Sequence, residues 1–403
     1  MANSGTRVTR LSPEKWAIDD GVLGGTAAAN ALGMRIFTKR SLLALVVLGS
    51  AAVAGCGASA TSADSAYSGS GTPTENAGRA SGEGTTGAAP GVSAGPSGGS
   101  SGTGTGTGAP IPAGQLTAGV WDDNLNYDFF GSYLQKAGGT PIFSQAERDA
   151  AHQRALAVTS AKSDLDVAIV LDTTSSMGDE IKYLQAEFDS IATTIKTKFP
   201  QTTPRFGLVL YRDHSDEYLT RAVPFTDDVA AFRASLAAQS SGGGGDMPEA
   251  VPEGLTEGVN LGWRTADNVA RVMFWVADAP QHPGEEQAVN TAVTAAVQKG
   301  IHVYPVGASG VDAAAELAMR GTAQITGGRY LFLTDDSGIG NSHAEPHIPC
   351  YVVTKLQGAM VRMVESEMVG HRAEPLASEV LRTVGSPTDG KCTLQNQTSV
   401  VLY

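Results

Sequence analysis

The stretch LDVAIVLDTTSSMGDEIKYLQAEF, residues 165–188, joins a strand pattern directly to a helix pattern. Its first seven residues are aliphatic apart from Asp166, which is typical of a parallel strand buried on both faces. Apolar residues then recur every three or four positions, as on one face of a helix, at Ile181, Leu184, Phe188, Ile191 and Ile195. Asp179 and Glu180 fall in the first turn, where the helix dipole favours acidic side chains. We predict a strand, a polar loop at 172–177 and a helix.

Further apolar runs along the chain follow the same pattern. They lie at 206–211, 272–276, 301–306 and 330–333, and helix-like stretches separate them. Alternating strands and helices predict an α/β fold of Rossmann-like architecture, with a mostly parallel sheet and helices on both faces. Because ligands of such sheets bind beyond the carboxyl ends of the strands, we expect the site in the loops at those ends.

Side chains with oxygen ligands occupy three of these loops. They are Asp172, Thr174 and Ser176 after the first strand, Asp246 in the loop SGGGGDMPEA, and Asp278 after the run at 272–276. Carboxylates and hydroxyls without His or Cys suit a hard divalent cation, Mg²⁺ before Ca²⁺ or Mn²⁺. Taken singly, an Asp at such a position is explained by helix capping or by a turn. Their combination beyond two buried strands favours a metal site.

The segment 163–370 resembles a von Willebrand factor A domain, because the order and the residues of these loops match its metal-ion-dependent adhesion site. The first motif of that site is D-x-[ST]-x-S, which is met here by Asp172, Thr174 and Ser176. The resemblance implies that the two hydroxyls bind the metal directly, and that Asp172 and Asp278 hold it largely through water. It also implies an open metal position that accepts a Glu or Asp of a partner protein, and therefore recognition and no enzyme activity.

The second loop departs from the better-known members of that family, in which a Thr completes the site. The nearest hydroxyls here belong to Ser240 and Ser241, and we take Asp246 as the candidate ligand. Glu249 fits either a cap of the following helix or a metal ligand, and we assign it a structural role. Three Asp side chains around one doubly charged ion would leave a formal charge of −1, which weakens the attraction for an acidic partner.

Two alternatives to metal-dependent binding remain open at this point. One is a metal-free domain that serves as a scaffold. The other is a Mg²⁺-dependent phosphotransfer enzyme, whose D-x-D-x-T loop also follows a first strand, although Thr174 stands where its second Asp is needed. Two matches to the hydrolase motif G-x-S-x-G, at 91–95 and 95–99, lack the required strand–turn–helix setting.

Composition excludes one class of partner and marks one segment as unfolded. The chain has 403 residues and a formal net charge of −13, and an acidic protein is poorly suited to nucleic acid. Glycine, serine, threonine and alanine dominate residues 56–115, which offer too little apolar surface to offset the entropy of ordering. We predict that this segment is a disordered tether.

The N-terminal part predicts a lipid anchor. Basic residues precede an apolar run at 41–55, as in a secretory signal peptide, and Val53-Ala54-Gly55-Cys56 resembles a bacterial lipobox. That resemblance implies diacylglycerol on Cys56 and a place in the bacterial cell envelope. Since Gly57 does not resemble the Asp of lipoproteins retained at the inner membrane, we expect the outer membrane. A buried helix with an incidental cysteine is the alternative.

The sequence divides accordingly into an extension upstream of a true start at Met34 (1–33), a signal peptide (34–55), a tether (56–115), an aromatic-rich arm (116–162), the A-type domain (163–370) and a tail (371–403). The arm is expected to pack on the domain, with a docking patch for a partner as the alternative, and to end in a short helix at 147–157. We expect an edge strand in the last residues of the tail, SVVLY.

The remaining cysteines allow two interpretations. Cys350 and Cys392 are left as a pair if Cys56 carries lipid, and an oxidising envelope favours a disulfide between them. Alternatively, His343, His347 and Cys350 lie within eight residues and would hold Zn²⁺ with a fourth ligand. Prolines at 346 and 349 favour a loop there, which removes the helical spacing that would align the two histidines.

Overall fold

The computed structural model describes residues 116–137, 141–157, 159–338 and 342–402. The expected upstream extension, signal peptide, lipidated Cys56 and tether lie outside the described residues. Those expectations therefore stay predictions, and the account below concerns the C-terminal part of the chain.

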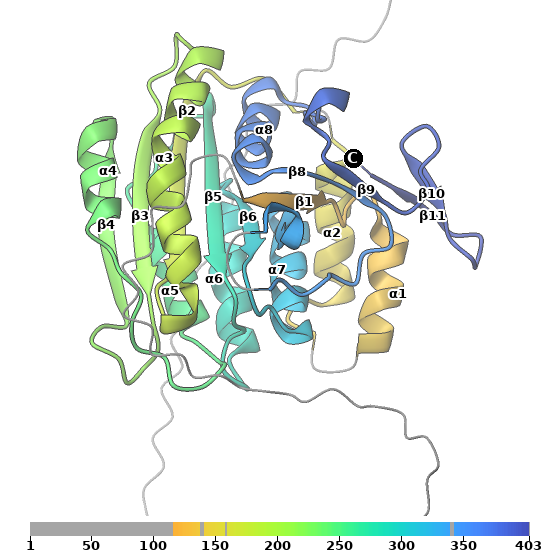
Figure 1. Cartoon of the computed structure of the whole chain (residues 1–403), viewed down its shortest axis with the longest axis horizontal. Helices are drawn as coiled ribbons and strands as arrows, with labels where there is room; N and C mark the ends of the chain where they lie inside the picture. Colours follow the sequence, from red (N-terminus) through yellow and green to blue (C-terminus); the bar gives the residue numbers. More distant parts are fainter. Residues whose placement is uncertain (1–115, 138–140, 158, 339–341, 403) are drawn as a thin grey trace, which may run out of the picture. The chain divides into compact units, whose positions relative to one another are not determined.

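A nine-stranded sheet, in the order β4-β3-β2-β5-β6-β7-β1-β8-β9, forms the centre of this part (Figure 1). Its strands are β1 (Thr117–Trp121), β2 (Asp164–Asp172), β3 (Arg205–Tyr211), β4 (Thr220–Thr226), β5 (Val269–Ala277), β6 (His302–Gly307), β7 (Tyr330–Thr334), β8 (Tyr351–Lys355) and β9 (Arg382–Val384). The five central strands, β3, β2, β5, β6 and β7, are mutually parallel, and the other four pair antiparallel with their neighbours. The predicted α/β fold with a parallel centre is confirmed.

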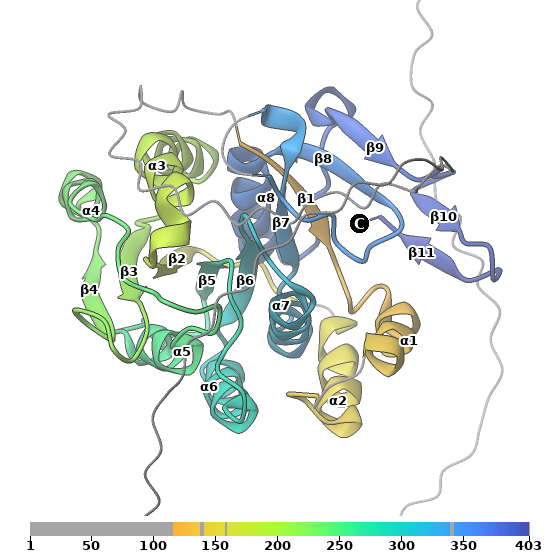
Figure 2. The ribbon, with the colours of Figure 1, turned by 60° about the horizontal axis from the view of Figure 1, so that its bottom comes forward.

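Helices cover both faces of the sheet (Figure 2). They are α1 (Tyr127–Ala137), α2 (Gln145–Ala155), α3 (Gly178–Lys198), α4 (Val229–Ala237), α5 (Val251–Asn260), α6 (Glu286–Gln298), α7 (Ala313–Thr326) and α8 (Leu356–Val369). Helices α3, α4 and α8 pack on one face, and α5, α6 and α7 pack on the other. The spacing of apolar residues that predicted α3 is explained by this layer, because all five of them are buried against the sheet.

The first described strand lies inside the sheet and not in an arm beside it. β1 pairs antiparallel with both β7 and β8, and its Trp121 is fully buried. An added Cβ at Gly119 would stand 2.2 Å from Phe332 Cζ, so this strand needs glycine where it passes the ring. The segment 116–162, which was expected to pack on the domain as an arm, therefore contributes a strand to the main sheet. A five-residue strand with partners more than 200 residues away leaves no periodic signal in the sequence.

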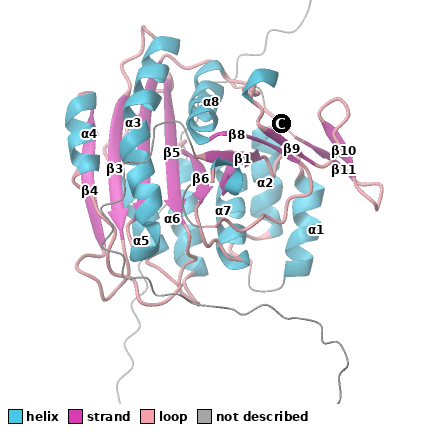
Figure 3. Cartoon of the chain, viewed as in Figure 1, coloured by secondary structure: helices cyan, strands magenta, loops and turns pink. Residues whose placement is uncertain are grey.

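The sheet also extends past the expected domain end at residue 370. Strand β9 pairs with β8 and forms an edge of the main sheet. The expected edge strand at SVVLY is present as β11 (Ser399–Val401), but it pairs only with β10 (Lys391–Thr393) in a separate two-stranded sheet (Figure 3). The expected edge strand is therefore confirmed, and it closes a C-terminal hairpin with β10.

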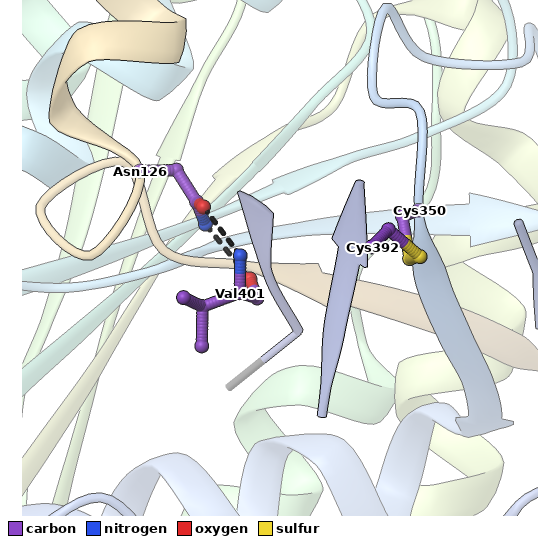
Figure 4. The surroundings of a disulfide bond; sticks show 4 residues. All are labelled: Asn126, Cys350, Cys392 and Val401. Atoms are coloured by element: carbon purple, nitrogen blue, oxygen red, sulfur yellow. Dashed lines mark hydrogen bonds between the residues drawn. A yellow bond between two sulfur atoms is a disulfide. The ribbon is translucent and has the colours of Figure 1, made fainter. Parts of the chain in front are cut away.

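The C-terminal hairpin is fastened to the body at two points (Figure 4). A disulfide joins Cys392 in β10 to Cys350, which directly precedes β8. The side chain of Asn126 donates a hydrogen bond to the Val401 carbonyl at 2.9 Å and accepts one from its amide at 2.7 Å. The tail is thus tied both to the start of β8 and to the segment that follows β1.

The alternative zinc cluster at His343, His347 and Cys350 does not form. The Cys350 sulfur is committed to the disulfide and offers no thiolate. His343 contacts Asp335 and the Ser309 hydroxyl, whereas His347 stacks on Tyr133 and bonds Glu316. The two imidazoles therefore have different neighbours, as expected for a loop without helical spacing.

Removing the disulfide should weaken the fold without changing its topology. The paired cysteines are 42 residues apart, and closing a loop of about 43 residues stabilises a protein by roughly 4 kcal/mol in the chain-entropy model. We expect Cys392→Ser to lower the unfolding free energy by up to that amount in urea titrations followed by tryptophan fluorescence. Dithiothreitol should lower the unfolding free energy of the wild type by a similar amount and leave that of the variant unchanged. Equal midpoints for wild type and variant would contradict the prediction.

Candidate metal centre

Four of the five predicted oxygen ligands, all except Asp246, meet at the carboxyl edge of the sheet. Asp172 is the last residue of β2, and Asp278 directly follows β5. These two strands are parallel neighbours, with Leu171 opposite Val276, so their following loops emerge side by side. From β2 the chain proceeds to β3 on one side and returns later to β5 on the other. Ligands of α/β sheets bind where the strand order reverses in this way.

The loop after β2 is folded around one oxygen of Asp172. Its Oδ1 accepts hydrogen bonds from the Thr174 amide at 2.9 Å and from the Thr174 hydroxyl at 2.7 Å. The hydroxyl oxygens of Thr174 and Ser176 are 3.4 Å apart, and Ser176 also bonds the Asp278 carboxylate. The structure therefore brings together Asp172, Thr174, Ser176 and Asp278, which the sequence placed in two separate loops.

Buried carboxylate oxygens without a hydrogen-bond partner make this edge a candidate cation site. Asp172 Oδ2, Asp278 Oδ1, Glu249 Oε2 and Glu180 Oε2 are all buried, and none has a hydrogen-bond partner among the described residues. An unpaired buried oxygen is costly, and an unpaired buried charge is costlier. Carboxylates and hydroxyls together are the donor set of Mg²⁺ and similar hard cations. The residues present thus fit a divalent metal ion.

Burial, together with the charges of neighbouring carboxylates, raises the pKa values of these carboxyls. Burial, and then the charge of Asp278, raises the pKa of Asp172 to about 7. Burial raises the pKa of Asp278 to about 6 against the opposing hydrogen bond from Ser176. Burial and the charge of Asp172 raise the pKa of Glu249 to about 9. Each group is reluctant to ionise unless a cation is near.

Glu249, and not Asp246, is the carboxylate of the second loop that lies among these groups. Asp246 is exposed, and its charge acts on His282, whose pKa it helps to raise. Glu249 is buried, and helix α5 takes its N-cap from Ala250 without a side-chain cap, so Glu249 has no capping role. Its burial, and the action of the Asp172 charge on its pKa, make Glu249 a second candidate ligand in this loop beside the structural role expected for it.

Glycine makes room between the first and second loops. Gly244 has a φ of +68°, and a Cβ there would stand 3.1 Å from Glu249 Oε1 and 3.2 Å from Thr174 Cβ. The loops are also tied by their backbones: the Ser175 amide and hydroxyl donate to the Gly243 carbonyl, and the Gly242 amide donates to the Thr173 carbonyl. Of the two hydroxyls expected nearby, Ser240 offers its carbonyl to Arg212, and Ser241 lies beside Gly178 at the start of α3.

Glu180 was not recognised from the sequence as part of this edge. Its Oε1 accepts hydrogen bonds from the amide and the hydroxyl of Ser309, in the loop after β6, at 3.1 and 2.7 Å. Its charge raises the pKa values of both Asp172 and Asp278. No sequence pattern indicates this role, because the helix dipole alone explains an acidic residue in the first turn of a helix.

Residues 166–333 match the von Willebrand factor A domain. We call the candidate ligands Asp172, Thr174, Ser176, Glu180, Glu249 and Asp278 the metal edge. The matching range contains all of them, whereas β1, β8, α8 and β9 lie outside it. No curated protein matches the chain.

Several solved structures are similar to this chain at low sequence identity. The conserved hypothetical protein BatB from Bacteroides thetaiotaomicron is 15% identical with a TM-score of 0.34, and the match covers 51% of this chain and 98% of BatB. The pilus adhesin SpaC from Lactobacillus rhamnosus GG is 11% identical with a TM-score of 0.34, covering 45% of this chain and 30% of SpaC. Its open conformation gives the same identity and TM-score, with 53% and 31% covered.

The shifted carboxyls of the A domain predict a stability that depends on pH and metal together. Asp172 and Asp278 bind protons more tightly folded than unfolded, so metal-free stability falls as pH rises from 3.8 through about 6 and 7. Mg²⁺ needs the ionised carboxylates, so its stabilisation grows over the same range and reaches about 2.7 kcal/mol at 100 times its dissociation constant. Thermal melts in EDTA and in Mg²⁺ between about pH 5 and pH 8 test this.

Asp172→Asn is the matched control for these melts. His282 and His302 also lose stabilising protonation as pH rises, because their pKa values are raised by Asp213 and Glu367. The variant keeps both histidines, so the difference between wild type and variant isolates the metal edge. The variant should show a flatter pH profile and no Mg²⁺ effect. A Mg²⁺ shift of equal size at both ends of the pH range would contradict the assignment.

Proposed function

We propose that this chain is a bacterial envelope lipoprotein whose A domain binds a divalent cation and, through it, a partner protein. The observation that carries the proposal is the pair of unpartnered, buried oxygens, Asp172 Oδ2 and Asp278 Oδ1, beside the hydroxyls of Thr174 and Ser176. Mg²⁺ is the expected ion, with Ca²⁺ or Mn²⁺ as substitutes. Adhesion or the assembly of a surface complex is the biological role that such binding would serve.

Each residue of the edge has a separate part in holding the ion. Thr174 and Ser176 would contribute neutral hydroxyl oxygens. Asp172 uses Oδ1 to fix Thr174 by two hydrogen bonds, which leaves Oδ2 for the ion or its water. Asp278 is oriented by Ser176 in the same way. When bound, the cation would supply the positive charge that attracts an acidic side chain of the partner.

Formal charge decides how strongly an acidic partner is attracted. Asp172 and Asp278 balance the two positive charges of one ion. A third ionised carboxylate, the role expected for Asp246, would leave a formal charge of −1 at the site. Glu249 now takes that place, since it is buried near Asp172 and Thr174 whereas Asp246 is exposed. Replacing Glu249 by Gln would keep its shape and remove the added charge.

We propose binding rather than catalysis for the same edge. A phosphotransfer loop needs a second carboxylate two residues after the first, and this chain has Thr174 there. The Thr174 hydroxyl is engaged by Asp172 and lies near the Ser176 hydroxyl, so it acts as a ligand and not as an acid or base. The chemistry of the edge is therefore suited to holding an ion and presenting it.

Attachment to the envelope is part of the proposal and rests on the sequence around Cys56. No helix within the described ranges is long and apolar enough to cross a membrane. The lipobox-like Val53–Cys56 and the following glycine-rich segment would connect the A domain to a membrane by lipid, in the outer membrane by the choice of Gly57. An envelope or extracellular protein is the partner that this location offers.

Partner capture from envelope extracts tests the proposed function. We expect the full chain to retain a partner in Mg²⁺, to release it in EDTA and to fail when Asp172→Ala removes the metal. Glu249→Gln removes the added negative charge and should strengthen capture of an acidic partner. Asp246→Asn, its matched control in the same loop, should leave capture close to wild type. Equal recovery in Mg²⁺ and EDTA would remove the metal from the mechanism and favour the metal-free scaffold.

A further inference from the structure

A second group of metal-ligating side chains lies at the same edge of the sheet, outside the centre described above. It consists of Asp213 and His214 after β3, Glu253 in the first turn of α5, and His282 and Glu285 in the loop between β5 and α6. None of the five is among the expected ligands of the first centre. The group differs from it in chemistry, because two imidazoles take part.

The ligand atoms form two overlapping groups of three that share His214. Those of Asp213, His214 and His282 all lie within 4.8 Å of one another, as do those of His214, Glu253 and Glu285. His282 Nε2 is 2.6 Å from Asp213 Oδ1, and His214 Nε2 is 3.4 Å from Glu285 Oε1. For comparison, tetrahedral Zn²⁺ with bonds of 2.0–2.1 Å separates its ligand atoms by about 3.3 Å. The His214–Glu285 separation matches that spacing, whereas His282 and Asp213 are joined by a hydrogen bond that an ion would replace.

Tight turns fix the backbone beneath the ligands. The Asp216 amide donates to the Asp213 carbonyl at 3.1 Å, and the Glu285 amide donates to the His282 carbonyl at the same distance. The Glu249 amide donates to the Pro280 carbonyl at 2.9 Å, which ties the second loop to the segment before His282. The Ala250 amide donates to the Arg212 carbonyl at 3.2 Å, so the loop after β3 is tied to the second loop as well. The ligand group is built by the fold and is not a chance meeting of long surface chains.

Simple ion pairing does not satisfy all of these groups. Asp213 can pair with His282, and Glu285 can pair with His214. Glu253 Oε2 and Glu285 Oε2 nevertheless stay buried without a hydrogen-bond partner among the described residues. Two imidazoles beside an excess of carboxylate oxygens are a donor set for zinc-like ions, since imidazole suits Zn²⁺ whereas Mg²⁺ prefers oxygen alone.

We propose that Asp213, His214 and His282 bind a zinc-class divalent ion, with Glu253 and Glu285 adding negative charge on the far side of His214. Three protein ligands leave a fourth position, which is the pattern of zinc sites that accept water or an external group. His214 and His282 keep 44% and 25% of their side-chain surface exposed, so that position is reachable from solvent. The A domain would then present two chemically different ions on one edge.

Zinc binding by the purified full chain tests the proposal independently of any partner. The protein carries an affinity tag without histidine, and Zn²⁺ is titrated against a fluorescent zinc chelator in excess Mg²⁺. We expect one tight site that excess Mg²⁺ does not displace. The double variant His214→Ala/His282→Ala should weaken zinc affinity by more than about 100-fold. Loss of a residue that only supports a metal ligand typically costs about 10- to 100-fold. His371→Ala, an exposed histidine outside the group, is the matched control.

A second variant separates this site from the proposed Mg²⁺ centre. Asp172→Ala should leave zinc affinity unchanged, and loss of zinc binding in that variant would place the ion in the first centre and overturn the proposal. Unchanged zinc affinity in the double histidine variant would overturn it as well. If that variant fails to fold by circular dichroism, X-ray absorption of the zinc-loaded wild type decides. Two imidazoles in an all-nitrogen-and-oxygen shell support the site, and fewer than two contradict it.

Discussion

Mutual repulsion among buried carboxylates at the carboxyl edge of the sheet is the constraint on which the account of this protein depends. The charges that act on Asp172 come from Asp278 and Glu180, and those that act on Glu249 come from Asp172 and other acidic groups. Burial strengthens that repulsion because little water screens it. A bound cation, as proposed above, would compensate for that repulsion, and the hydroxyl groups beside the carboxylates suit a hard metal ion.

Strand pairing and loop contacts bring these carboxylates together. Parallel pairing of β2 with β5 sets Asp172 and Asp278 on adjacent loops, and glycine at position 244 lets the second loop approach Thr174. Backbone hydrogen bonds then join the first loop to the second, and the second to the segment before His282. The same edge consequently carries two ligand groups of different chemistry, one of oxygen alone and one with imidazole nitrogen.

Local patterns explain what the sequence could predict. The strand at 165–171 and helix α3 were recognisable because hydrophobic periodicity is a local property, and Asp172, Thr174, Ser176 and Asp278 followed because parallel strands end at one edge. β1 was missed because its partners are remote in sequence. Glu249 and Glu180 were passed over because helix capping and the helix dipole explain an acidic residue equally well. His214 and His282 gave no signal, since only the fold brings the loops after β3 and β5 together.

The most direct test of the central claim is an anomalous difference map from crystals soaked in Mn²⁺, which substitutes for Mg²⁺ and scatters anomalously. The account predicts a peak bounded by Asp172, Thr174, Ser176 and Asp278, and its absence from crystals of Asp172→Ala. A map without density at that edge, from crystals in which those four side chains keep the arrangement described here, would contradict it.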